Sequence, residues 1–219
     1  MDAAATPNAQ TRALLARLEP IEGSIDFFRR LKAESERYWK SVSLERSLYG
    51  FQVQPSTEWR PGLSEQQLAE FEEALGFAFP EILRNYFRVM NGTTFPQVNI
   101  YGSSGESHTY AQKYYAWPEN IHIIRKSIAW ICQEMKVQPN ELKRKNISRI
   151  FPVVGHRFLM IDIPGHPVLS MYGNDIIPWS HDLCGLLIDD IFGEEASLAP
   201  GSDEAGAPRF PEVPFWLGA

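Results

Sequence analysis

The clearest hydrophobic pattern in the chain is the stretch "LSEQQLAEFEEALGFAFPEILRNYFRVMNG", residues 63 to 92, which predicts two consecutive helices. Ser64 is a favourable N-cap residue, and Gln67 can complete a capping box with it. Gly76 stands where a helix commonly ends in the left-handed conformation, and Asn91-Gly92 ends the second helix. The apolar residues at helical spacing are Leu68, Phe71, Leu75, Ile82, Leu83, Tyr86, Phe87 and Met90. The hairpin therefore offers an apolar slab that can cover one face of a sheet.

A longer amphipathic pattern precedes the hairpin and predicts one helix over residues 24–49, ended by Gly50. Its apolar stripe consists of Ile25, Phe28, Leu31, Tyr38, Val42 and Leu48. The other side carries charges of both signs and is expected to face solvent, through Arg29, Arg30, Lys32, Glu34, Glu36 and Arg37. Two prolines and a glycine in "FQVQPSTEWRPG" then predict an extended connector to the main domain.

Strand and turn patterns dominate the rest of the chain, with two helices among them. Turn residues and isolated β-formers after the hairpin predict a strand or two and a long loop, followed by a helix over 120–135. Ser180 is expected to cap a final helix that runs through Phe192. Between these helices, three β-rich runs separated by turn residues predict an antiparallel meander at 150–154, 157–163 and 167–172.

The order of helices, then strands, then a closing helix predicts an α+β fold, in which helices cover a mostly antiparallel sheet. We expect an N-terminal helical extension with its connector over residues 1–58, the α+β domain over 59–193, and a tail over 194–219. The tail is acidic and rich in Pro, Gly and Ala, which is typical of a mobile segment, although its terminal "PFWL" can dock on the domain.

Composition and charge narrow the class of protein. A chain of 219 residues with 44% hydrophobic composition fits one ordinary domain with a modest appendage. A formal net charge of −6 disfavours direct nucleic-acid binding, which depends on clustered Lys and Arg, and suits a basic partner. No apolar run approaches the roughly 20 residues of a membrane span, and the start lacks a secretory leader pattern. With no disulfide framework expected from Cys132 and Cys184, these features predict a cytoplasmic protein.

Sequence motifs for catalysis or metal binding are weak. The five histidines show no close pair at the spacing of a helical or zinc-finger site, so we expect no metal and no cofactor. The loop "YGSSGES" has neither the G-x-S-x-G spacing of a hydrolase elbow nor the Gly-Lys-Ser/Thr ending of a phosphate loop. Asp189 and Asp190 are adjacent on a predicted helix and point about 100 degrees apart, so they do not form an acid/base pair by themselves. We therefore predict no catalytic residues. The alternative is an enzyme whose catalytic groups are distant in sequence and come together in space.

The segment "HTYAQKYYAWPE" is the strongest candidate for partner binding. It crowds aromatic side chains into a predicted loop and ends in an acid, and the candidate residues are Tyr110, Tyr114, Tyr115, Trp117 and Glu119. Tyrosine and tryptophan are enriched at binding hot spots. The alternative is that these aromatic residues pack under the long loop and hold it on the domain.

The cap and turn residues of the hairpin resemble those of the SUKH superfamily. This superfamily includes immunity proteins of bacterial polymorphic toxin systems and a fungal regulator of cell-wall synthesis. The resemblance rests on the motif residues Leu63-Ser64, Glu72, Leu75-Gly76, Phe79-Pro80 and Asn91-Gly92. Further on, "FPVVGHRFLMIDIPGHPVLSMY" and "PWSHDLCGLLIDDIF" look like the family's strand pair and its closing helix, so that the resemblance covers roughly residues 60 to 193. The chain departs from the family pattern at Phe79, where leucine is usual, and in an insertion-like region from 101 to 149.

The resemblance implies an α+β SUKH-like fold and a non-catalytic immunity protein that binds and neutralises a cognate toxin. The net charge of −6 would complement a basic, nuclease-type toxin. An alternative is a regulatory or scaffolding module that acts on host proteins, with the first helix and the acidic tail as its contact segments. A third hypothesis is an enzyme whose catalytic groups come from distant parts of the sequence.

Overall fold

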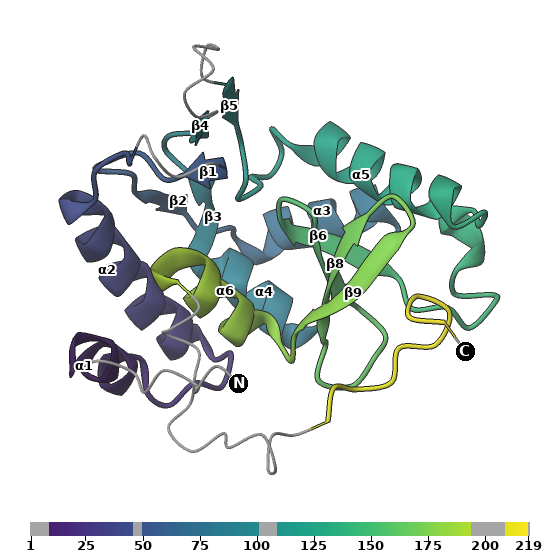
Figure 1. Ribbon diagram of the computed structural model, residues 1–219. Coiled ribbons are helices and arrows are strands. Elements are labelled where there is room, and N and C mark those ends of the chain that lie inside the picture. Colours follow the sequence, from purple (N-terminus) through teal and green to yellow (C-terminus); the bar gives the residue numbers. More distant parts are fainter. Residues whose placement is uncertain (1–8, 46–49, 101–108, 194–208, 219) are drawn as a thin grey trace.

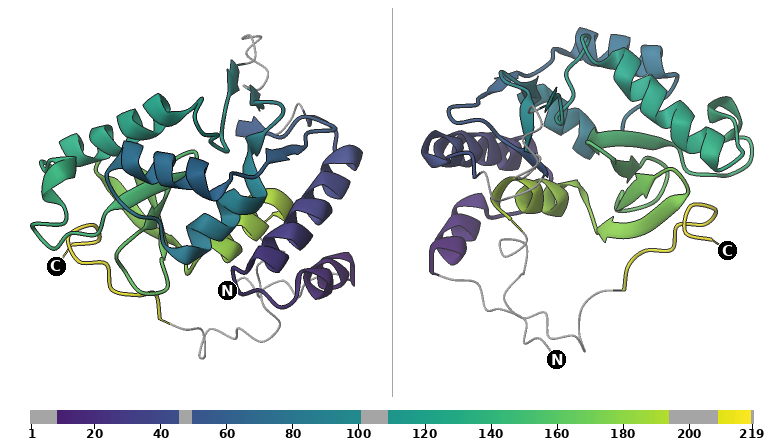
Figure 2. Two further views of the ribbon diagram at one scale, coloured as in Figure 1. Left: turned by 180° about the vertical axis from the view of Figure 1, so that it is seen from behind. Right: turned by 45° about the horizontal axis from the view of Figure 1, so that its top comes forward.

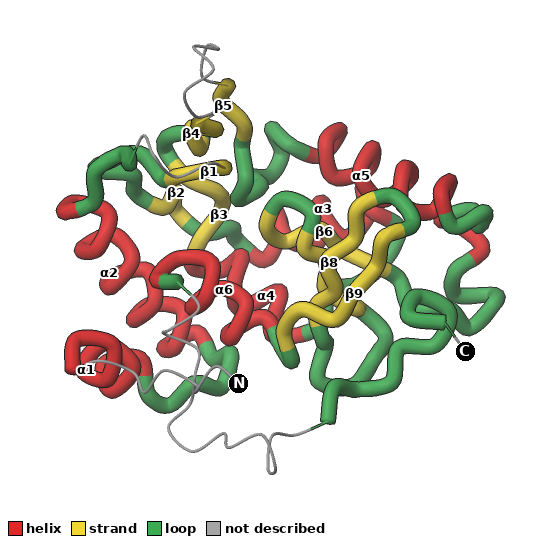
Figure 3. The backbone as a smooth tube through the Cα atoms, viewed as in Figure 1, coloured by secondary structure: helices red, strands yellow, loops and turns green. Residues whose placement is uncertain are grey.

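The computed structural model describes residues 9–45, 50–100, 109–193 and 209–218 and confirms an α+β fold (Figures 1 and 3). The helices are α1 (Ala9–Leu18), α2 (Ile25–Ser41), α3 (Glu65–Leu75), α4 (Glu81–Val89), α5 (Ile121–Glu134), the short η1 (Pro139–Glu141) and α6 (Leu183–Phe192). The strands are β1 (Gly50–Gln52), β2 (Trp59–Pro61), β3 (Met90–Thr93), β4 (Gln97–Ile100), β5 (Thr109–Ala111), β6 (Ile150–Val154), β7 (Arg157–Met160), β8 (Val168–Tyr172) and β9 (Asp175–Ser180).

All strand pairs among the described residues are antiparallel, as expected, but they form three sheets. The largest has the order β6-β7-β8-β9, and the others are β1-β4-β5 and β2-β3. The α3–α4 hairpin lies behind the four-stranded sheet in Figure 1 and in front of it in the reverse view of Figure 2. The hairpin thus covers one face of this sheet, as its apolar slab predicts.

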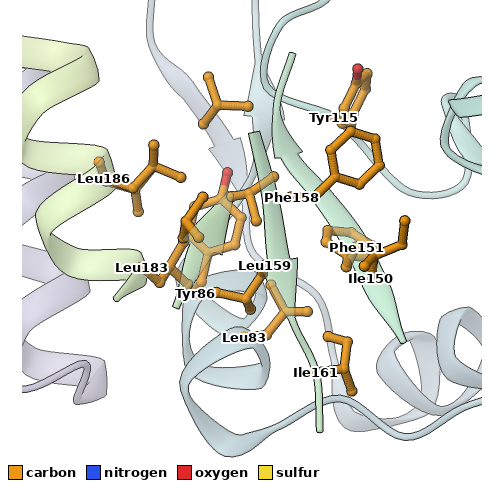
Figure 4. Close-up of a cluster of buried hydrophobic side chains, with 14 of the residues drawn as sticks. Leu83, Tyr86, Tyr115, Ile150, Phe151, Phe158, Leu159, Ile161, Leu183 and Leu186 are labelled. Carbon is orange, nitrogen blue, oxygen red and sulfur yellow. The ribbon is translucent and has the colours of Figure 1, made fainter. Parts of the chain in front are cut away.

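Aromatic residues join the hairpin to the sheet. The ring centroid of Phe151 on β6 lies 5.9 Å from that of Phe71 on α3 and 5.8 Å from that of Phe87 on α4. Figure 4 shows side chains of α4, β6, β7 and α6 converging in this core, including Leu83, Leu159 and Leu183. Burial of such side chains contributes roughly 1.5–3 kcal/mol each, so this interface is a main source of stability.

The hairpin termini follow the sequence prediction closely. Ser64 and Gln67 form both hydrogen bonds of a capping box, and Gly76 ends α3 at φ 77°. The carboxylate of Glu72 accepts hydrogen bonds from the backbone N–H of Phe79 at 2.7 Å and from Arg84 at 2.5 Å, which fixes the turn between the helices. The prediction is wrong at the far end, because α4 ends at Val89 and Asn91-Gly92 lie in strand β3, which begins at Met90.

The prediction for residues 24–61 is partly wrong. The helix ends at Ser41, and the connector contributes strands β1 and β2. A further helix, α1, precedes α2, and Arg17 of α1 pairs with Glu34 of α2 at 3.0 Å. Glu34 is buried and also pairs with Arg37, so it does not face solvent as expected. The division at residue 58 stays a prediction, and α2 packs against both α4 and α6 (Figure 2).

The last part of the chain also differs from the prediction. A fourth strand, β9, completes the meander, and Asp182 caps α6 through the N–H of Gly185 in place of Ser180. The tail docks through Trp216, which is buried and donates its indole N–H to the carbonyl of Ser148 at 2.8 Å. Residues 194–208 of the tail, and the whole "YGSSGES" loop, lie outside the described residues.

Replacing Tyr86 with phenylalanine is expected to leave the free energy of unfolding unchanged or to raise it by about 1 kcal/mol. The Tyr86 hydroxyl is buried and has no hydrogen-bond partner within the described part of the chain, so it carries a desolvation cost without compensation. Tyr114→Phe is the matched control, because the Tyr114 hydroxyl donates to Asp190 at 2.5 Å. That variant should lose about 1.5 kcal/mol or more in urea unfolding, and equal losses in both would contradict the assignment.

Candidate interaction site

A groove of about 690 Å³ lies where five segments of the chain meet. These segments are β1, the end of β5 with the residues that follow it, the start of α5, the β6–β7 turn and α6. The lining residues used below are Phe51, Tyr110, Lys113, His156, Arg157 and Asp190. The volume falls in the range of small-ligand and peptide pockets, and apolar walls surround a few polar groups, as is usual for binding sites.

Asp190 organises the polar floor of this groove. Its carboxylate pairs with Lys113 at 2.7 Å and accepts the hydroxyl hydrogen bond of Tyr114. Burial raises the pKa of Tyr114 well above its ordinary value, and the negative charge of Asp190 raises it further. Burial also raises the pKa of Tyr115, whose hydroxyl donates to the Gly155 carbonyl at 3.1 Å. Both phenols therefore stay protonated at neutral pH and serve as hydrogen-bond donors.

His156 and Arg157 form the wall toward the four-stranded sheet. Burial lowers the pKa of His156, and the positive charges of Arg157 and Lys113 lower it further, so the imidazole is neutral at pH 7. The Arg157 guanidinium lies 3.4 Å from the ring centroid of Trp179 and donates a hydrogen bond to Ser170. Burial lowers the pKa of Arg157, but an arginine keeps its charge in proteins.

The outer face of β8 and β9 continues this wall. Strand register places Ser170 between Arg157 and Ile177, and side chains two residues apart in a strand share a face. Tyr172, Ile177 and Trp179, which we call the aromatic face, are 68%, 47% and 40% exposed. Among the described residues, no helix lies in front of β8 and β9 in Figure 1.

Two contacts make the groove and the aromatic face one continuous surface. Arg157 lines the groove and stacks on Trp179, while the ring of His156 lies 6.2 Å from that of Tyr172. The far side of Tyr172 contacts Trp130 of α5, at 5.1 Å between ring centroids. The surface therefore spans from β5 and α6 across the β6–β7 turn to the edge strand β9.

The residues predicted from sequence to bind a partner have different locations. Tyr110 is 61% exposed and lines the groove, and Tyr115 lines it from a buried position. Tyr114 is fully buried under the loop. Trp117 stacks on Phe71, at 4.7 Å between ring centroids, and the fifth residue, Glu119, pairs with Arg60 at 3.2 Å. Tyr114 and Trp117 thus hold the segment on the domain, and Tyr110 is the candidate that projects from it.

The sequence analysis did not identify the rest of the surface. The missed residues are Phe51, Lys113, His156, Arg157, Tyr172, Ile177, Trp179 and Asp190. One partial signal was available, because Ile177 and Trp179 stand two positions apart in "DIIPWS", the spacing of side chains on one face of a strand. The other residues come together only through strand pairing and helix packing.

The described residues also bear on metal binding, membrane spanning and disulfide formation. The described ranges contain no group of three or more His, Cys, Asp or Glu side chains placed to hold a metal ion. Within those ranges, no helix is both long and apolar enough to cross a membrane. Cys132 and Cys184 are buried and unbonded to each other.

A groove next to exposed aromatic residues is a feature common at protein-interaction surfaces. Residues 62–145 match the model of the family described as "SMI1 / KNR4 family (SUKH-1)". The matched residues run from the α3–α4 hairpin through η1, and this match supports membership of the SUKH superfamily. Neither the curated proteins nor the solved structures gave a match. The match fits a protein that acts through protein–protein interaction.

Proposed function

We propose that this protein is a non-catalytic immunity protein that binds a cognate bacterial toxin domain in the cytoplasm and blocks its active site or substrate groove. The observation that carries the proposal is the continuous surface made by the groove and the aromatic face. Tyr, Trp and Arg are the residue types that dominate binding energy at protein interfaces, and this surface presents Tyr172, Trp179 and Arg157 together.

The overall charge supports a toxin with a basic surface, such as a nuclease. A net charge of −6 speeds association with a positively charged partner by long-range attraction. Neutralisation by occlusion requires a stable complex and no reaction, so the proposal involves no cofactor, no direct nucleic-acid binding and no membrane.

The test uses the toxin domain encoded next to this protein. Co-expression should protect cells from the toxin, and the purified proteins should form an equimolar complex. The double variant Tyr172→Ala/Trp179→Ala should bind at least about tenfold more weakly, because a hot-spot aromatic residue contributes more than about 1 kcal/mol. Phe95→Ala is the matched control, since Phe95 is 46% exposed but lies on neither the groove nor the aromatic face. A wild-type protein that neither protects nor binds would remove the basis of the proposal.

The rival function is a regulatory or scaffolding module that acts on host proteins, which the family match supports equally in its coarse form. Affinity capture of the tagged protein from its native cells separates the two. One roughly equimolar partner with a toxin-like domain supports neutralisation, whereas several host proteins without a toxin support scaffolding.

A further inference from the structure

Arg157 carries a charge that the described residues do not neutralise. Its side chain is partly buried, and its one side-chain hydrogen bond to another described residue goes to the neutral hydroxyl of Ser170. Other sheltered arginines behave differently: Arg84 bonds Glu65 and Glu72, and Arg149 bonds Asp162. A guanidinium has five N–H donors, so most of those on Arg157 remain available.

The groups around Arg157 do not supply the missing anion. On α6, the negative charge of Asp190 raises the pKa of Arg157, but the carboxylate oxygens of Asp190 bond Lys113 and Tyr114 and form no ion pair with Arg157 among the described residues. His156 is neutral at pH 7 because burial and its cationic neighbours lower its pKa. On β9, Asp175 pairs in register with Tyr172, and no ion pair joins it to Arg157 within the described ranges. Among the described groove residues, Lys113 and Arg157 thus share one carboxylate, and Arg157 is the cation without an ion pair.

Stacking leaves this charge in a defined orientation. With Trp179 against its flat face, the guanidinium directs its remaining N–H groups along its own plane. A carboxylate approaching in that plane can accept two parallel hydrogen bonds, the strongest geometry for an arginine. Exposed apolar side chains, Ile177 and Tyr172, lie on the same face of the sheet.

From this arrangement we infer that the surface recognises an acidic anchor on its protein partner, an Asp or Glu side chain next to an apolar residue. The carboxylate pairs with Arg157, and the apolar neighbour lies on the aromatic face. The inference rests on the proposed interaction function and specifies its chemistry: a basic toxin attracted over long range would still present a carboxylate at this point.

The experiment selects binders to the immobilised full chain from a displayed library of short random peptides. Wild-type protein should enrich peptides in which Asp or Glu stands beside an aromatic or aliphatic residue. Arg157→Gln should weaken binding of those peptides by about tenfold or more, since a hydrogen bond to a charged group is stronger than a neutral one. Arg144→Gln is the matched control, because Arg144 is highly exposed and remote from the groove lining.

Arg157→Lys separates charge from geometry and should restore part of the affinity, because lysine keeps the charge without the planar fork. Thermal midpoints of all variants verify that they fold. Selected peptides without an acidic residue, or acidic peptides that bind Arg157→Gln as well as wild type, would overturn the inference. Preferred binding of a single-stranded oligonucleotide through Arg157 would overturn it as well, in favour of a phosphate anchor.

The two proposals can fail separately. If Arg157→Gln still binds the toxin while Tyr172→Ala/Trp179→Ala does not, the acidic anchor is wrong and neutralisation stands. If acidic peptides bind through Arg157 but no toxin does, the anchor stands and the toxin assignment fails.

Discussion

Replacing Gly62 with alanine is expected to destabilise the protein by about 3 kcal/mol or more, because a methyl group at this position has no space. Gly62 joins β2 to the first helix of the hairpin and lies against the backbone at the end of α4. A Cβ atom on Gly62 would lie 2.0 Å from the carbonyl oxygen of Arg88 and 2.6 Å from the backbone nitrogen of Val89. Backbone atoms cannot rotate away as a side chain can, so either α4 or the connection must shift.

The shift would disturb a contact that orders the hairpin. The neighbouring residue, Leu63, is buried, and its N–H donates to the Phe87 carbonyl at 2.8 Å. Moving this connection away from α4 would weaken that bond and open the core around Phe87. The measurement is the free energy of unfolding in urea, together with the thermal midpoint.

Gly165→Ala is the control for this prediction. Gly165 has φ +78°, but nothing lies within 4 Å of its Cβ position. Alanine there should cost about 1–2 kcal/mol for the left-handed conformation alone. A Gly62→Ala variant that is as stable as Gly165→Ala would show that the backbone contact is looser than the structure has it.

Sequence reasoning succeeded where structure depends on neighbouring residues. The capping box of Ser64 and Gln67 and the left-handed Gly76 are local devices, and both are present as predicted. Gly62, in contrast, looks like an ordinary turn glycine in "WRPGLS", because its close approach to Arg88 involves α4, which comes after the whole of α3 in the sequence. Neighbouring residues determine the caps of the hairpin, whereas tertiary packing determines that position 62 must be glycine.

The candidate interaction surface was the hardest part to predict for the same reason. Lys113 and Asp190 are 77 residues apart, and Arg157 meets Trp179 only because β8 lies between their strands. The aromatic residues in "HTYAQKYYAWPE" suggested a partner-binding segment. Their locations differ, because Tyr114 is fully buried whereas Tyr110 is 61% exposed. Period and composition do not distinguish these two roles.

In helix α2, one polar residue on the buried face, Ser35, made that face difficult to predict from the sequence. The predicted stripe included Tyr38, which is 43% exposed, and omitted Trp39, which is 1% exposed. The buried line runs through Leu31, Ser35 and Trp39, with Ser35 facing the core because it accepts the indole hydrogen bond of Trp59 at 2.7 Å. A buried serine is favourable only when it has a hydrogen-bond partner. The sequence alone does not indicate that Trp59 is that partner.

Replacing Trp39 with alanine is therefore expected to lower the free energy of unfolding by about 3–5 kcal/mol, the usual cost of truncating a buried aromatic residue. Trp39 joins α2 to the main core. Its ring centroid lies 5.3 Å from that of Trp59 on β2 and 6.2 Å from that of Tyr114, whose hydroxyl bonds Asp190 in the groove. The cavity left by alanine would open between α2 and the floor of the groove, so the binding surface should loosen as well.

Trp130→Ala provides the matched control, since Trp130 is a tryptophan on α5 that is 36% exposed. Its truncation should cost about 1 kcal/mol, because less surface is buried and no closed cavity forms. Urea unfolding of both variants, followed by tryptophan fluorescence and circular dichroism, measures the difference. A Trp39→Ala loss no larger than that of Trp130→Ala would mean that α2 is an appendage to a core that stands without it, as the predicted boundary at residue 58 implies. A loss of 3–5 kcal/mol would mean that residues before this boundary are part of the domain that holds the groove in shape.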